Sequence, residues 1–119
     1  MTVLYGIPNC DTCRKARRWL EANAIDYRFH DLRADGLDKH RVDHWLQHFD
    51  AAALVNRRST SWRQLDATER ALADGPEVTG LLVAHPTLVK RPVLETDDAC
   101  LVGFREEIWR RALLDGRDA

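Results

Sequence analysis

The stretch Thr2-Val-Leu-Tyr-Gly-Ile-Pro-Asn-Cys-Asp-Thr-Cys13 decides the fold. Its first residues, 2–6, read as a short buried strand that ends in a glycine and is soon followed by a proline. Apolar residues then recur at helical spacing through about Asn23. Residues 26–32 alternate apolar and polar side chains, as a strand does. Such a strand–helix–strand unit of about 30 residues places its two strands parallel in one sheet.

The middle of the chain predicts helices. Val42, Trp45, Leu46 and Phe49 recur at the i, i+3, i+4, i+7 spacing of an amphipathic helix. The four residues 66–69 have the residue types of a capping box, which opens another short helix. Residues 56–64 are polar and rich in Arg and Ser, so we expect a loop or a broken helical turn there.

The end of the chain predicts a hairpin and a last helix. Residues 93–96 and 99–102 read as two strands joined by a turn at Asp97-Asp98. A helix over 105–114 follows, with these apolar residues expected to face inward: Ile108, Ala112 and Leu113. The order is therefore β-α-β, a helical insertion at about 38–88, then β-β-α. We predict an α/β chain with a single thioredoxin-like domain over 1–119.

Composition limits the classes of function. The 119 residues carry a formal net charge of −1, which favours neither direct nucleic-acid binding nor an anionic membrane. No apolar run approaches the ~20 residues that span a bilayer. The N-terminus has no basic leader, so we expect no signal peptide and a cytoplasmic location. The three cysteines, an odd number, are then expected to be thiols unless they have redox work.

Cys10 is the predicted nucleophile. A thiol at a helix N-terminus is stabilised as thiolate by unpaired backbone N–H groups and by the helix dipole. Cys13, one helical turn on, could attack a mixed disulfide on Cys10. Zinc is disfavoured because no second ligand pair follows, so we predict no metal. That both cysteines are simply small core residues is the remaining alternative.

Several neighbouring residues are candidates for substrate binding. Asn9 and Thr12 flank the cysteine loop, and Arg14 could bring positive charge to the thiol, whereas Arg17 and Arg18 read as a solvated helix face. Further along, Arg57 lies in a polar loop, where function concentrates. Arg91-Pro92 precedes a strand, and such an X-Pro bond can be cis.

Four ordered motifs resemble one family. They read Tyr5-Gly-Ile-Pro-Asn-Cys-Asp-Thr-Cys-Arg-Lys-Ala16, Leu54-Val-Asn-Arg-Arg-Ser-Thr-Ser-Trp-Arg63, His85-Pro-Thr-Leu-Val-Lys-Arg-Pro-Val93 and Leu101-Val-Gly-Phe104. The chain thereby resembles the arsenate reductase (ArsC)/Spx family of thioredoxin-like proteins, and most of all its YffB-type branch, considered to be glutathione-dependent thiol reductases. The resemblance implies that Cys10 is the nucleophile, that Pro92 is a cis proline facing it and that Arg91 reaches the site.

The resemblance also orders the candidate functions. It implies a thiol reductase with glutathione as co-substrate, no tightly bound cofactor and glutaredoxin as a potential partner. One alternative is an Spx-like redox-sensing regulator that binds RNA polymerase. Another is arsenate reduction, for which the family uses three arginines. In this chain two of those positions are Asn56 and Gly103, so anion clamping is weakened and thiol substrates are favoured.

Overall fold

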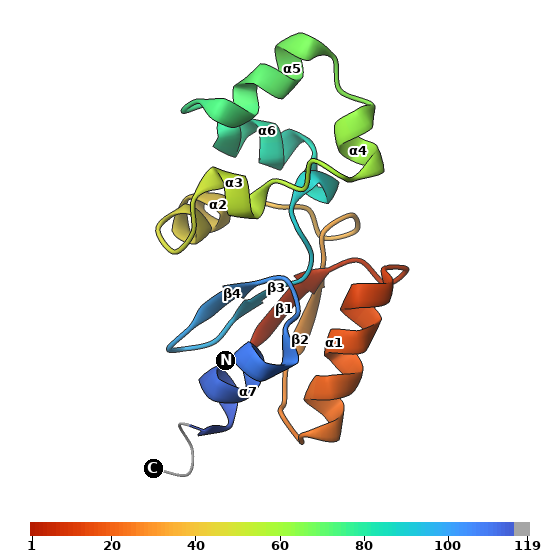
Figure 1. Cartoon of the computed structure of the whole chain (residues 1–119), viewed down its shortest axis with the longest axis vertical. Helices are drawn as coiled ribbons and strands as arrows, with labels where there is room; N and C mark the ends of the chain where they lie inside the picture. Colours follow the sequence, from red (N-terminus) through yellow and green to blue (C-terminus); the bar gives the residue numbers. More distant parts are fainter. Residues whose placement is uncertain (116–119) are drawn as a thin grey trace. The chain divides into compact units, whose positions relative to one another are not determined.

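The computed structural model describes residues 1–115. Strand β1, Val3–Gly6, leads through the cysteine loop into helix α1, Asp11–Ala22, and strand β2, Arg28–Asp31, follows. The hairpin consists of β3, Val93–Glu95, and β4, Cys100–Val102, and the last helix is α7, Glu106–Leu113. The predicted β-α-β and β-β-α segments are confirmed, with boundaries that differ by one to a few residues (Figure 1).

The four strands form one mixed sheet in the order β2-β1-β3-β4. β3 runs antiparallel to β1, with Leu4 opposite Leu94, and antiparallel to β4, with Val93 opposite Val102. The sheet therefore brings an N-terminal and a C-terminal segment together. The loop that follows β1 and the segment that precedes β3 lie at neighbouring strand ends. This places Cys10 and Arg91 beyond the same end of the two central strands, β1 and β3.

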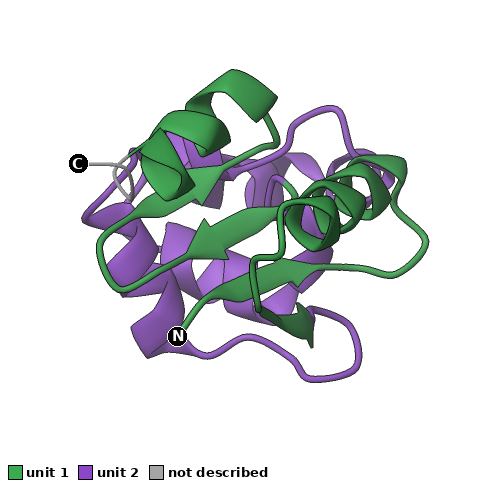
Figure 2. Cartoon of the chain, turned by 90° about the horizontal axis from the view of Figure 1, so that it is seen from below, with its two compact units in different colours: residues 1–30, 91–119 green, residues 31–90 purple. Residues whose placement is uncertain are grey.

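The chain divides into two compact units, coloured separately in Figure 2. The sheet unit comprises residues 1–30 and 91–119, of which 116–119 lie outside the described part, and the helical unit comprises residues 31–90. The organisation of the whole chain as a single domain stays a prediction.

Helices α1 and α7 pack against one face of the sheet. The core of this unit is formed by buried side chains from β1, β3, α1, α7 and the turn after α1: Leu4, Ala16, Trp19, Leu20, Ile25, Leu94 and Trp109. The inward face of α7 matches the prediction at Leu113, which packs against this core, and differs at the other two residues. Ile108 is 39% exposed and Ala112 is also exposed, whereas Trp109 is only 1% exposed. The larger indole fills the space against α1, so α7 is rotated relative to the expected orientation.

The helical unit consists of short helices, and in α2 to α5 the residue before the helix caps it with its side chain. They are α2 (Lys39–Leu46), α3 (Ala51–Leu54), α4 (Thr60–Arg63), α5 (Ala67–Ala71), α6 (Val78–Ala84) and two 3-10 turns, Leu72–Asp74 and Pro86–Leu88. The capping box of Asp66 and Glu69 is confirmed at the start of α5. Asp38 caps α2, which thus begins earlier than the apolar periodicity indicated. Asp50 caps α3, a helix that the sequence analysis missed.

Candidate functional site

Cys10 is the residue that precedes helix α1. Its backbone is extended (φ −105°, ψ 124°), and its carbonyl oxygen accepts the first helical hydrogen bond, 2.9 Å from the Arg14 nitrogen. The side chain is half-buried. The helix start predicted at the cysteine motif is confirmed. The sulfur thus lies where the first N–H groups of a 12-residue helix are free to donate.

Several groups act on the Cys10 sulfur. Partial burial alone would raise the pKa of Cys10, since it removes water from the thiolate. Hydrogen bonds from the backbone N–H and the thiol of Cys13, and from the Arg91 side chain with its positive charge, outweigh burial. The pKa of Cys10 is therefore lowered, and the arrangement favours a nucleophilic thiolate.

Cys13 has the opposite character. It is 0% exposed, and burial together with the hydrogen bond to Cys10 and the charge of that sulfur raises the pKa of Cys13 to about 12. The backbone N–H of Ile7 and the charge of Arg91 act in the other direction but do not reverse the shift. At neutral pH Cys13 therefore remains a thiol and donates its proton toward Cys10.

Gly6 provides the space for the Cys13 side chain. A Cβ atom built on Gly6 would lie 2.6 Å from the Cys13 Sγ, closer than two such atoms can approach. The sequence analysis recognised Gly6 only as the end of a strand. A clue lies in the sequence, because Cys13 shares the helical spacing of Ala16 and Leu20, the inward side of α1, which faces the strand that Gly6 ends.

The Arg91–Pro92 segment, at the start of the second stretch of sequence in the sheet unit, completes the site. The Arg91–Pro92 peptide bond is cis, as the resemblance implied. The Gly103 N–H donates to the Pro92 carbonyl at 2.8 Å, and Gly103 has a φ of +76°, a backbone conformation that favours glycine. An arginine side chain at this position, as in the arsenate-binding arrangement, would therefore cost backbone strain.

The predicted substrate-binding residues near the cysteine loop differ in their contacts. Asn9 and Thr12 are exposed on the two sides of Cys10. Arg14 pairs with Asp11 at 2.8 Å and donates to the Pro8 carbonyl at 3.3 Å. These contacts brace the cysteine loop from its solvent side, and the roles of these residues in substrate binding stay predictions.

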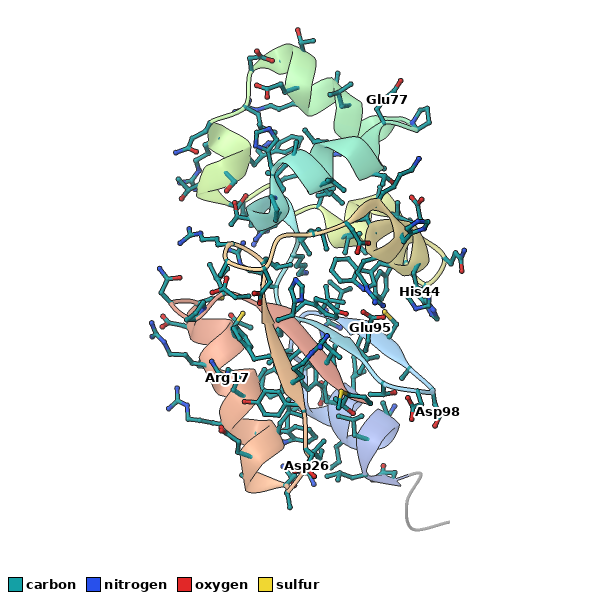
Figure 3. All side chains as sticks on the ribbon, turned by 180° about the vertical axis from the view of Figure 1, so that it is seen from behind. Arg17, Asp26, His44, Glu77, Glu95 and Asp98 are labelled. Carbon is teal, nitrogen blue, oxygen red and sulfur yellow. The ribbon has the colours of Figure 1, made fainter. Side chains whose placement is uncertain are left out.

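Arg17 differs from the expectation of a solvated helix face. The Arg17 side chain, labelled in Figure 3, is half-buried. It donates to the Tyr27 hydroxyl at 3.1 Å and lies 4.2 Å above the centre of the Phe29 ring. This cation therefore joins α1 to β2 by a cation–π contact. Arg18 is exposed, as expected.

Arg57 belongs to the helical unit. Its guanidinium pairs with Asp74 at 2.7 Å and lies 5.1 Å from the centre of the Trp62 ring, with Arg70 also facing that ring at 5.7 Å. Asn56 accepts a hydrogen bond from the Arg58 backbone at 3.0 Å. The role of Arg57 toward a substrate of Cys10 stays a prediction.

Two features, a metal-ligand cluster and a membrane-spanning helix, concern the part of the chain that the structure describes, residues 1–115. Among these residues no group of three or more His, Cys, Asp or Glu side chains could hold a metal ion. In the same part of the chain, no helix has the length and apolar character needed to cross a bilayer.

Comparison with curated proteins gives relatives over nearly the whole chain. The model of the ArsC family matches residues 5–112. An uncharacterized protein of Haemophilus influenzae is 40% identical over 112 residues, which cover 94% of this chain and 98% of the relative. The global transcriptional regulator Spx of Lactiplantibacillus plantarum is 30% identical over 115 residues, 95% of this chain and 86% of the relative.

Solved structures of related proteins also match nearly the whole chain. A protein described as YffB is 38% identical, with a TM-score of 0.87, and the match covers 95% of this chain and 99% of the other. An arsenate reductase (ArsC) related protein from Brucella melitensis is 42% identical, with a TM-score of 0.71 and coverage of 92% of each chain.

Proposed function

The chain belongs to the ArsC family, and from this premise we propose that it is a thiol–disulfide oxidoreductase with Cys10 as nucleophile and glutathione as co-substrate. The observation that carries the proposal is the set of donors around one sulfur. The Cys13 N–H, the Cys13 thiol and the Arg91 guanidinium all lower the pKa of Cys10, against its partial burial. A thiolate with an open side is the group that thiol–disulfide exchange requires.

In the first step the Cys10 thiolate attacks the glutathione sulfur of a mixed disulfide. The new S–S bond joins Cys10 to glutathione, the old S–S bond breaks, and the target leaves as a thiolate that takes a proton from solvent. The electron pair of the broken bond leaves with the target sulfur, which is thereby reduced to a thiol, and Cys10 becomes oxidised as a glutathione mixed disulfide. Before the attack, the Arg91 cation stabilises the Cys10 thiolate by its hydrogen bond and its charge.

In the second step a glutathione thiolate attacks the glutathione sulfur held on Cys10. Oxidised glutathione leaves, and the electron pair of the broken bond returns to Cys10 as thiolate. Cys13 is the alternative attacking group. However, it is fully buried, and burial, the largest cause of the raised pKa of Cys13, still disfavours its thiolate when Cys10 is held in a mixed disulfide. This supports resolution by glutathione, with glutaredoxin as a further candidate reductant, and it suits a cytoplasmic location.

Turnover of a small glutathione mixed disulfide tests the proposal. Reduction of the disulfide is followed with excess glutathione for the wild type, Cys10→Ser and Cys13→Ser. We expect Cys10→Ser to lose essentially all catalysed turnover and Cys13→Ser to retain most of it. Absence of turnover in the wild type, or full turnover in Cys10→Ser, would contradict the proposal. Arsenate-dependent oxidation of glutathione, measured in parallel, reports the arsenate reductase alternative.

A second candidate is a redox-sensing regulator that binds RNA polymerase. It is favoured by the 30% identity with the Spx protein and by the two cysteines three residues apart. In this case a Cys10–Cys13 disulfide would switch binding on or off. A pull-down with the C-terminal domain of the polymerase α subunit tests it, and no binding in either redox state would remove it.

A further inference from the structure

The residue pair at the end of the β3–β4 pairing, Pro92 and Gly103, lacks one of the two hydrogen bonds that such a pair can form. The register Val93 opposite Val102 continues to Pro92 opposite Gly103, and the Gly103 N–H donates to the Pro92 carbonyl at 2.8 Å. In a hydrogen-bonded antiparallel pair the two residues exchange two bonds. Pro92 has no N–H to return, so the sheet offers no donor from Pro92 to the Gly103 carbonyl.

Trp109 supplies the missing donor. Its indole Nε1–H donates to the Gly103 carbonyl at 3.1 Å. The side chain is 1% exposed and makes edge contacts with Phe104, at 4.8 Å between ring centres, and with Trp19, at 6.1 Å. The indole is thus held rigidly on α7, and through Gly103 it fixes the position of Pro92.

From this arrangement we infer that Trp109 is a positioning residue, which replaces the N–H that Pro92 lacks and so holds Arg91 against Cys10. The connection runs from the Trp109 indole to the Gly103 carbonyl, from the Gly103 N–H to the Pro92 carbonyl, and through one peptide bond to Arg91. The Arg91 side chain makes a hydrogen bond to the Cys10 sulfur. The inference rests on the proposed function of Cys10 as a thiolate nucleophile.

Trp19 offers a matched control. It belongs to the same core as Trp109 and is 8% exposed. Its indole also donates one hydrogen bond, to Glu106 at 3.1 Å, but that bond leads to the surface of α7 rather than to Pro92. Trp19→Phe therefore removes the same atoms from the same core. It keeps an aromatic ring beside Trp109 and removes none of the hydrogen bonds that connect Trp109, Gly103 and Pro92.

The test compares Trp109→Phe with Trp19→Phe in the full chain. The rate of Cys10 alkylation by iodoacetamide is measured against pH, because its midpoint reports thiolate formation, and unfolding is measured alongside. We expect Trp109→Phe to lower the rate roughly three- to tenfold at pH values below the midpoint and to move the midpoint upward. Trp19→Phe should leave the alkylation rate and its midpoint unchanged, although we expect it to lower the free energy of unfolding by a similar amount. Adding Arg91→Ala to either variant should abolish the difference between them.

The results distinguish a failure of the proposed function from a failure of the role inferred for Trp109. An ordinary thiol midpoint for wild-type Cys10 would overturn the proposed function itself. A lowered wild-type midpoint that Trp109→Phe leaves unchanged, or that Trp19→Phe raises equally, would overturn only the role of Trp109. If Trp109→Phe does not fold, NMR of the wild type decides: the Trp109 indole N–H resonance should titrate with the Cys10 midpoint. A Trp109 resonance that stays constant while Cys10 titrates would overturn the inference.

Discussion

Cys10 and Cys13 are three residues apart but have opposite chemistry. The Cys10 sulfur is half-buried and receives donors from Cys13 and Arg91, so its pKa is lowered. Cys13 is fully buried, and its pKa is raised to about 12. Position along the helix explains the difference: Cys10 precedes the first turn, while Cys13 lies on the inward face of that turn, against Gly6. Cys10 is therefore the thiolate of the pair, and Cys13 is a thiol that donates a hydrogen bond to it.

Alkylation should distinguish the two sulfurs. At pH 7 we expect iodoacetamide to modify Cys10 at least about tenfold faster than Cys13, because only the thiolate reacts and Cys13 is inaccessible. As the pH falls through the lowered pKa of Cys10, its rate should decline. Peptide mapping by mass spectrometry gives the rate at each cysteine. Equal rates for both residues in folded protein would contradict the assigned roles.

At the scale of elements, the close approach of β1 and α1 depends on a glycine. Gly6→Ala introduces a Cβ 2.6 Å from the Cys13 Sγ, so strand or helix must shift. We expect a loss of about 1–3 kcal/mol in the free energy of unfolding and a slower reaction of Cys10. Urea denaturation followed by circular dichroism measures the stability.

Gly80→Ala is the control for this substitution. Gly80 lies within α6, is exposed, and has nothing within 4 Å of an added Cβ. Alanine has the higher helix propensity, so this variant should gain about 0.5–1 kcal/mol. A Gly6→Ala variant as stable as the wild type would contradict the packing argument.

The elements also show what sequence patterns can and cannot predict. The β-α-β start, the hairpin and the α5 capping box follow from local periodicity and cap residues, and all were predicted. The inward face of α7 was predicted only in part: Leu113 packs against the core, whereas Ile108 and Ala112 are exposed and Trp109 is buried. The spacing of apolar residues does not show which of them is large enough to fill the space against α1. The packing of Gly6 on Cys13 and the Trp109 bond to Gly103 each join two different elements across a turn or loop, and periodicity within one element does not predict how two elements pack.

At the scale of the whole molecule, ionisation of Cys10 is linked to folding. Because the pKa of Cys10 is lowered in the folded chain, the unfolded chain binds more protons between the two pKa values. The contribution of the thiolate is therefore complete above the ordinary thiol pKa of about 8.5. It is lost as the pH falls through the lowered value.

Unfolding experiments should reveal this linkage. The difference in free energy of unfolding between wild type and Cys10→Ser should increase as the pH rises from about 5 to about 8. Urea denaturation at several pH values measures it. The range stays below pH 8 because Cys13, with its raised pKa, opposes folding at alkaline pH. A difference that is constant with pH, or that decreases, would show that the folded chain does not stabilise the thiolate.

The central claim is that Cys10 is the nucleophile for glutathione disulfides, and one measurement tests it most directly. The reduced protein is incubated with oxidised glutathione at neutral pH, and the modified cysteines are mapped by mass spectrometry, with Cys10→Ser as control. We expect a glutathione mixed disulfide on Cys10, with Cys13 unmodified and no adduct at this site in the control. An unmodified Cys10 alongside an adduct elsewhere, or no adduct at all, would contradict it.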